Sequence, residues 1–189
     1  MLWAKNSVNP PGWLPLYVHS NDTSGIIHKL WDEWLGQNTK ERITEGISLG
    51  DGHPSDSTMG AIISFIGACH DIGKASPIFQ VKIRNEDPLN LLSRVESSPL
   101  KLRDDIRTSE LTHSIISELI MERNGIDTSV SIIVGGHHGT QPTKDQLKDA
   151  SFFPNHSGFN DDDWKHVQDD LLCYMACLLY TSDAADEAR

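Results

Sequence analysis

The chain of 189 residues is long enough for one domain with a sizeable core, and it carries a formal net charge of −11. This acidity excludes a broad basic face that would hold nucleic acid by neutralising phosphates alone. The odd number of cysteines and the absence of a leader with a cleavage site before the first proline pair lead us to expect a cytoplasmic protein. No apolar stretch approaches the roughly 20 residues that span a bilayer, which excludes a transmembrane protein.

The first third of the chain predicts an extended lead-in followed by a helix. Residues 1–16 contain three prolines and two tryptophans and predict an aromatic-pinned, extended segment. An amphipathic helix is predicted from Asn21 or Asp22 to about Leu35, with His19 just ahead of it. Its apolar side chains recur every four positions at Ile26, Leu30 and Trp34, with Ile27 and Trp31 alongside.

The strongest chemical signal is the sequence IGACHDIGK at 66–74. His70 and Asp71 follow an apolar run at 61–66, which predicts a buried helix capped by Ser57 or Thr58. Burying an imidazole and a carboxylate without partners is costly, and both are ligands that divalent metals accept. Gly73 permits a sharp exit from the helix, and Lys74 places a flexible cation beyond the pair, in reach of a phosphate.

The clearest helical pattern of the chain runs from Ser109 to a stop signal at 124–125. His113 falls within the apolar arc of this helix. A buried histidine is more often hydrogen-bonded in a core than bound to a metal, so this residue alone leaves both interpretations open. Between Pro77 and Pro99 the breakers leave room for only one or two short helices.

Another apolar helix is predicted from Thr128 or Ser129, and it runs into the sequence GGHHG at 135–139. The glycines around His137 and His138 allow close backbone approach and give little steric cover. That environment fits a metal or phosphate edge better than a core, and a solvated polar loop is the alternative. A polar helix beginning at 142–143 and a loop at 152–159 follow.

Asn160 followed by three aspartates predicts the start of a last helix, where the acids match the positive end of the helix dipole. Cys173 and Cys177 lie one turn apart on this helix, and we interpret them as small core residues and not as zinc ligands. No segment alternates as a strand does, so the fold class that we predict is all-α. Three further histidines are assigned to solvent: His53, His156 and His166.

Six candidate ligands lie at the ends or on the inner faces of predicted helices: His19, His70, Asp71, His113, His137 and His138. Helical bundles build metal sites from facing helices in this way. A histidine-rich set with one carboxylate and no thiolate favours Mn, Fe, Co, Ni or Zn, with Mg possible. Two such ions, about 3.5–4 Å apart, can activate a water for phosphodiester hydrolysis, and Asp71 would then bridge them.

The order of these motifs resembles the HD nuclease domain of the CRISPR-associated type I interference nuclease-helicase, within the HD phosphohydrolase superfamily. The similarity extends over about residues 2–180 and is most specific in KASPIFQ at 74–80 and HHG at 137–139. It implies an HD-domain helical bundle, ligation of up to two metal ions by the six side chains above, and cleavage of single-stranded DNA. It also implies a helicase domain or subunit that feeds the strand and a guide-RNA surveillance complex that recruits the nuclease.

One departure concerns a further aspartate ligand, which the family places on a later helix before an Asp-Trp pair. No such segment occurs here, so we expect an HD-type nuclease domain over 1–180 that stops before its final helix. Residues 181–189 do not resemble the family, and we expect a frayed tail with Asp183 and Asp186 in water. The alternative functions are an HD-type nucleotide phosphohydrolase, favoured by a closed pocket, and an inactive metal-stabilised remnant that only binds a partner.

Overall fold

The computed structural model describes residues 1–186 apart from 48–51, 86, 104–105 and 107–110, and it leaves out the side chains of residues 8 and 179–186. The first half contains β1 (Trp3–Val8), β2 (Pro11–Pro15), α1 (Leu16–Lys29), the π-helical turn η1 (Leu30–Trp34), α2 (Gln37–Glu45), α3 (Asp56–Cys69) and the 3-10 turn η2 (Ile72–Lys74). The second half contains α4 (Pro77–Gln80), the 3-10 turn η3 (Val81–Ile83), α5 (Leu91–Glu96), α6 (His113–Arg123), α7 (Thr128–Gly135), α8 (Lys144–Ser151), α9 (Pro154–Ser157) and α10 (Asp162–Asp186). The prediction of a helical fold is confirmed.

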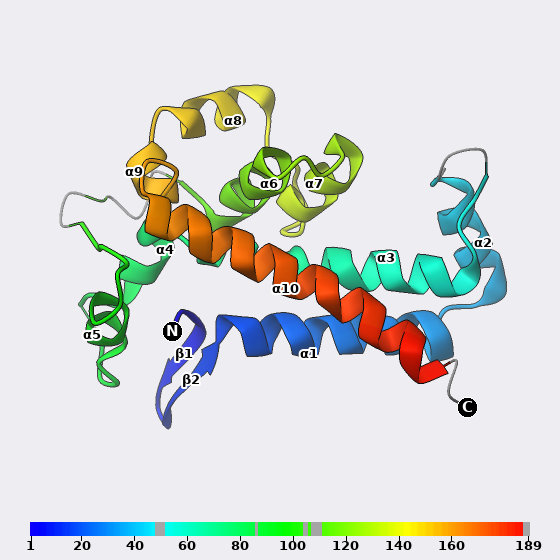
Figure 1. Cartoon of the computed structure of the whole chain (residues 1–189), viewed down its shortest axis with the longest axis horizontal. Helices are drawn as coiled ribbons and strands as arrows, with labels where there is room; N and C mark the ends of the chain where they lie inside the picture. The colour runs from blue at the N-terminus through cyan, green and yellow to red at the C-terminus, as the bar shows by residue number, and fades with distance from the viewer. Residues whose placement is uncertain (48–51, 86, 104–105, 107–110, 187–189) are drawn as a thin grey trace.

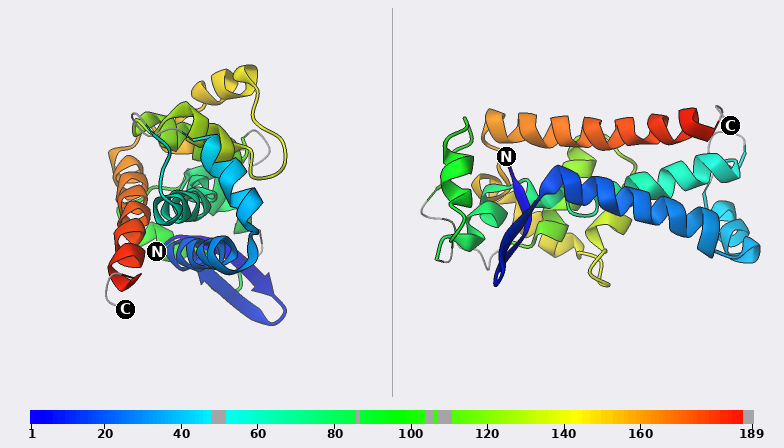
Figure 2. Two further views of the ribbon diagram at one scale, coloured as in Figure 1. Left: turned by 90° about the vertical axis from the view of Figure 1, so that its right-hand side faces the viewer. Right: turned by 90° about the horizontal axis from the view of Figure 1, so that it is seen from below.

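Three long helices form the body of the molecule. α1 and α3 lie side by side, and α10 crosses both of them on one side (Figure 1; Figure 2). α6 and α7 pack together beside η2, at the end of α3 (Figure 1). Within the described part of the chain, no helix combines the length and apolar character needed to cross a membrane.

The N-terminal segment is extended and pinned by an aromatic side chain, as predicted, but it also forms a strand pair that the sequence did not indicate. β1 and β2 pair antiparallel, with Trp3 opposite Pro15. The Trp3 ring packs at 4.5 Å from the ring of Phe79, and its backbone nitrogen donates to the Gln80 side chain at 3.3 Å. Tertiary contacts therefore stabilise the hairpin, although its sequence lacks the alternation of apolar and polar residues that is typical of strands.

Helix α1 begins at Leu16, earlier than predicted, so His19 lies inside its first turns and not ahead of it. The predicted apolar face of this helix is buried only in part. Ile26 and Trp34 are 59% and 76% exposed, whereas Trp31 is fully buried. The row of Ile26, Leu30 and Trp34 faces outward. The flanking Ile27 and Trp31 contact α3, where glycines leave room for them.

The row of Ile26, Leu30 and Trp34 lies outside because of the way in which α1 meets α3. Small side chains of α1, Ser20 and Ser24, are buried and let the two helices approach closely. Gly60 and Gly67 of α3 supply the opposite gaps: a Cβ at Gly60 would lie 3.0 Å from the Trp31 ring, and one at Gly67 would strike the Ile27 side chain. Small residues of both helices thus leave room for Ile27 and Trp31 at the contact with α3.

Helix α10 corrects two further predictions. Cys173 and Cys177 are exposed and not part of the core, because Trp164, Leu172 and Met175 form the buried side of this helix. The backbone remains helical to Asp186, beyond the predicted frayed end at residue 181.

Other helix ends differ from the predictions by smaller amounts. Asp161, not Asn160, caps α10 by accepting from the backbone nitrogens of residues 163 and 164. Ser55 caps α3, earlier than the predicted Ser57 or Thr58. α6 starts at His113, and the predicted start at Ser109 lies outside the described residues. The side chains of Asp183 and Asp186 are also outside the description.

Candidate metal centre

Hydrogen bonds hold the short loop after α3 against α6. The Ser117 hydroxyl donates to the carbonyl oxygen of His70 at 3.0 Å and accepts from the backbone nitrogen of Gly73 at 2.9 Å. The carbonyl oxygen of His113 sits so close to Gly73 that a Cβ there would collide with it. Ser117 and Gly73 therefore fix the loop that carries His70 and Asp71 relative to the first turn of α6.

Asp71 lies at the centre of the site and is only 4% exposed. Its Oδ2 atom is 2.9 Å from His19 Nε2, 3.1 Å from His70 Nε2 and 2.7 Å from Lys74 Nζ. These partners come from α1, from the end of α3 and from η2. One oxygen of the carboxylate thus collects side chains from three segments.

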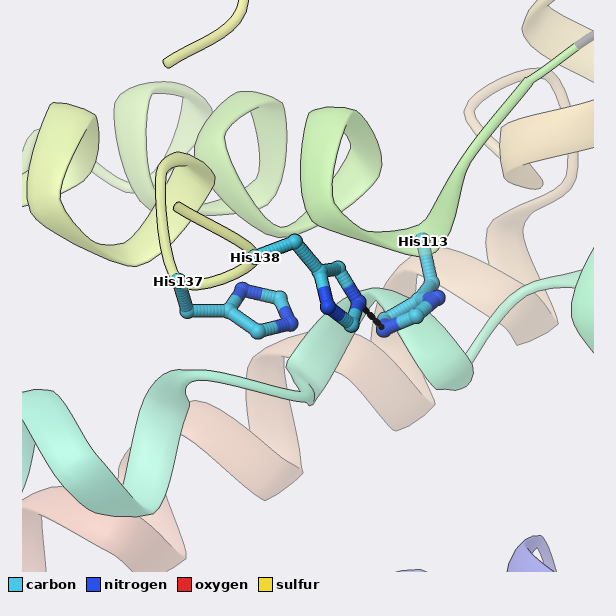
Figure 3. A group of neighbouring side chains, drawn as sticks. All are labelled: His113, His137 and His138. Atoms are coloured by element: carbon cyan, nitrogen blue, oxygen red, sulfur yellow. Dashed lines mark hydrogen bonds between the residues drawn. The ribbon is translucent and has the colours of Figure 1, made fainter. Parts of the chain in front are cut away.

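The second oxygen of Asp71 faces a different set of histidines. Oδ1 is 3.0 Å from His113 Nε2 and 3.6 Å from His137 Nε2. His138 Nε2 lies 3.1 Å from His113 Nε2. Figure 3 shows these three imidazoles converging from the start of α6 and from the turn after α7.

The six predicted ligands therefore form two groups that meet at one carboxylate. Within each group the ligand atoms lie within 4.8 Å of one another. The groups are His19, His70, Asp71 and His113, His137, His138. All six residues singled out from the sequence are brought together.

The hydrogen bonds of the histidines show that cations fit here. Nδ1 of His70 donates to the carbonyl oxygen of Gly67, and Nδ1 of His137 donates to that of Val134, each at 2.7 Å. In the neutral tautomer this leaves both Nε2 lone pairs directed inward, and the Nε2 atom of His137 is buried without a hydrogen-bond partner. Lone pairs that face a carboxylate need positive charge between them, which a divalent metal supplies.

The protonation states of Asp71 and His19 also favour metal binding. Burial alone would raise the pKa of Asp71, but its contacts with His113, His70 and the Lys74 ammonium in the metal-free site outweigh burial, and the pKa lies well below its usual range. Burial lowers the pKa of His19, and the charge of Asp71 only partly opposes this. The site thus holds an ionised carboxylate and a neutral imidazole, the forms in which these groups bind metals.

His137 should make the stability of the metal-free protein depend on pH. Burial lowers its pKa to about 4, against 6.5 for an ordinary histidine. Below pH 6.5 the unfolded chain takes up a proton that the folded chain refuses until about pH 4, so the free energy of unfolding should fall across this window by roughly 2–3 kcal/mol. Urea unfolding at several pH values should show a smaller fall in the free energy of unfolding for His137→Asn than for the wild type. The exposed control His166→Asn should show the same fall as the wild type. Equal falls in the wild type and His137→Asn would contradict the effect of burial.

The remaining site predictions divide as follows. His53 and His166 are exposed, as predicted. His156 is half-buried, so its assignment to solvent is wrong; the short helix α9, which replaces the predicted loop, turns it partly inward. Sequence reasoning gave no role to Ser117 or Gln80, although the Gln80 amide donates to the carbonyl oxygens of Trp3 and Lys74 at 3.0 and 2.9 Å. No spacing signal marks such supporting residues.

A family profile described as "Cas3, HD domain" matches residues 3–189. This chain belongs to the Cas3 HD-domain family. A curated relative, the CRISPR-associated nuclease/helicase Cas3 of Streptococcus thermophilus, is 31% identical over 146 residues, which are 72% of this chain and 16% of the relative. The Cas3 HD domain of this chain therefore spans less than a fifth of that protein.

Solved structures show the same Cas3 HD-domain fold. The crystal structure of a CRISPR-associated protein has a TM-score of 0.77 and 27% identity, with 94% of this chain and 19% of that chain covered. A chain of a CRISPR RNA-guided surveillance complex, pre-nicking, has a TM-score of 0.66 and 23% identity, with 94% and 21% covered. The second likeness shows the fold alone.

Proposed function

We propose that this chain is a metal-dependent phosphodiesterase that cleaves single-stranded DNA in CRISPR interference against foreign DNA. The observation that carries the proposal is Asp71, whose two oxygens each face one of the two histidine groups. A shared carboxylate between two ligand groups is the arrangement that holds a pair of metal ions over one phosphate. Membership of the Cas3 HD family supports nuclease chemistry at this site.

We assign the metal ligands as His19, His70, Asp71, His113, His137 and His138, with room for up to two divalent ions. Histidine ligation without thiolates favours Mn, Fe, Co, Ni or Zn, although Mg is possible. Such ions lower the pKa of a bound water and neutralise charge that develops on the phosphate. The protein contributes the orientation: the Nδ1 bonds of His70 and His137 to backbone carbonyls hold each ring with Nε2 inward.

Lys74 is the second catalytic residue of the proposal. Its ammonium donates to Asp71 Oδ2 at 2.7 Å and to the carbonyl oxygen of Ala4 at 3.2 Å. An ammonium carries three donors, so one remains for a phosphate oxygen of the substrate. The hairpin thereby holds Lys74 in position beside the shared carboxylate.

Lys74→Gln should keep bound metal but lose turnover. Removal of the cation leaves the ligand carboxylate in place, while a donor to the developing phosphate charge is lost, at a cost of about 10²–10³ in rate. Metal analysis by mass spectrometry and single-turnover cleavage of single-stranded DNA provide the two measurements. If metal content fell as far as in His70→Ala, Lys74 would have a purely structural role.

The partners that we propose are single-stranded DNA, a helicase and a guide-RNA surveillance complex, in the cytoplasm. The relative's name, nuclease/helicase, and the structural neighbour within a surveillance complex support this. The charge of −11 fits an enzyme to which DNA is delivered, since the chain lacks the overall positive charge for capturing it alone.

Accessibility of the second histidine group favours a strand over a free nucleotide as substrate. His138 is exposed, and His113 and His137 are half-buried, so this group opens toward solvent. An open site suits a polymer that continues past the reacting phosphate, whereas a nucleotide phosphohydrolase needs walls around a small molecule. An HD-type nucleotide phosphohydrolase remains the second candidate because the same ligands serve both reactions.

Bound metal measured together with activity on several substrates tests the proposal. Circular single-stranded DNA should be cut in the presence of manganese or nickel, and deoxynucleotides should not be hydrolysed. Hydrolysis of nucleotides alone would favour the second candidate. Stoichiometric metal without either activity would identify an inactive metal-stabilised remnant that serves as a binding module.

A further inference from the structure

Beside the metal centre lies a second cation that the mechanism does not use. Lys82, in η3, places its Nζ 5.1 Å from the centre of the Phe79 ring. Lys74 places its own Nζ 5.2 Å from the centre of the same ring. The two ammonium groups therefore share one aromatic side chain, although only Lys74 reaches Asp71.

The shared ring is held firmly and adjoins a proposed ligand. Phe79 is 6% exposed and is packed by Trp3, with ring centres 4.5 Å apart. Its other neighbour is His113, whose ring centre lies 5.5 Å away in an edge-on arrangement. A fixed ring within about 6 Å of an ammonium attracts it to the ring face. Phe79 therefore holds Lys82 one side chain away from the open histidine group.

Lys82 forms no ion pair with any acid in the part of the chain that the structure describes. Lys74, by contrast, is paired with Asp71. Lys82 is exposed, so its ammonium is accessible to a ligand. Partial burial and the neighbouring charge of Lys74 lower the pKa of Lys82, which agrees with two like charges held close together. A phosphate anion close to Lys82 would offset the repulsion between the two cations.

We propose that Lys82, oriented by Phe79, binds a phosphate of the DNA strand next to the one being cleaved, on the His113 side of the centre. This inference rests on the proposed function and deepens it, because a flanking-phosphate contact distinguishes a polynucleotide from a mononucleotide. Proteins that bind single strands use positive charge along the path of the phosphate backbone. In an acidic chain, a cation without an acidic partner among the described residues gives a local contact that the net charge cannot provide.

A pair of substrates separates this role from direct catalysis. Bis(p-nitrophenyl) phosphate has one phosphate and needs only the metal centre, whereas an oligodeoxynucleotide also offers flanking phosphates. With manganese present, Lys82→Gln should raise KM for single-stranded DNA about three- to tenfold. Its kcat for the small diester should equal that of the wild type, and Lys82→Arg should restore the KM for DNA.

Binding supplies a measurement that does not depend on turnover. The anisotropy of a labelled single strand, followed against salt concentration, should give a log–log slope that is smaller by about 0.7 for Lys82→Gln. Lys148→Gln is the matched control, since Lys148 is an exposed lysine of α8 and its loss changes the net charge equally. It should behave as wild type in every assay.

Three results would overturn the inference: equal loss on both substrates, an equal effect of Lys148→Gln, or an unchanged KM and salt slope in Lys82→Gln while the wild type cleaves DNA. Inactivity of the wild type on both substrates would instead count against the proposed function. In that case the salt slope alone decides the role of Lys82 in binding the strand.

Discussion

Asp71→Asn should abolish metal-dependent cleavage of single-stranded DNA, with a loss of more than about 100-fold. The substitution keeps the shape of the side chain but removes the charge that both histidine groups share. Asp71 Oδ2 faces His19 at 2.9 Å, and Oδ1 faces His113 at 3.0 Å, so one change affects both proposed metal positions. Loss of His138, which belongs to one group only, should leave the other position intact.

Calorimetric titration with manganese, together with single-turnover cleavage, measures this effect. His166→Ala is the matched control, because His166 is exposed on α10 and we assign it no ligand role. Far-ultraviolet circular dichroism shows whether Asp71→Asn still folds, since removing one partner from a buried ionic cluster can destabilise a protein by about 3–5 kcal/mol. Wild-type activity in a folded Asp71→Asn variant would disprove the shared-carboxylate assignment.

The two adjacent pairs of candidate ligands were predictable because they are short-range features of the sequence, whereas His113 taken alone left both a core and a metal role open. His70 and Asp71 are adjacent, and His137 and His138 are adjacent between glycines, so each pair marks its own position in the chain. Polar ligands at the ends of apolar helices have few alternatives to a common partner, since burial without one is costly. The assembly of both pairs around one carboxylate agrees with this argument.

The parts that could not be predicted depend on contacts between distant segments. The apolar row of α1 faces outward because Gly60 and Gly67 of α3 create space for Trp31 and Ile27, and hydrophobic periodicity carries no information about such gaps. Likewise, the hairpin depends on Gln80, which bonds to the Trp3 backbone across 77 residues. Tertiary packing determines both the outward-facing row of α1 and the formation of the hairpin.

Lys82 illustrates the same limit within the site. Its ammonium lies near the same Phe79 ring as that of Lys74, while the sequence shows only one more lysine between Val81 and Ile83. A cation can be recognised as unpaired only when its neighbours are known. Functional groups outside compact motifs therefore become visible only in the folded chain.

Gly73→Ala should destabilise the protein by at least about 3 kcal/mol and weaken metal binding with it. A Cβ at this position would strike the carbonyl oxygen of His113 and lie 2.6 Å from the backbone nitrogen of Ser117. Both are backbone atoms of α6, which cannot rotate away as a side-chain end can. The loop must then move off α6, which breaks the 2.9 Å bond from the Gly73 nitrogen to the Ser117 hydroxyl and carries Asp71 away from His113.

For a chain of this length, the loss should lower the melting temperature by roughly 10 °C. Gly25→Ala is the matched control: Gly25 lies in α1, a Cβ added there would meet nothing within 4 Å, and alanine should stabilise the helix by about 0.5–1 kcal/mol. Thermal unfolding with and without manganese gives a second comparison, because bound metal adds less stability when its ligands are displaced. If Gly73→Ala melted like wild type and gained as much from manganese, the loop would not depend on its close approach to α6, and the backbone lock between Gly73 and Ser117 would not be what holds Asp71 between the two histidine groups.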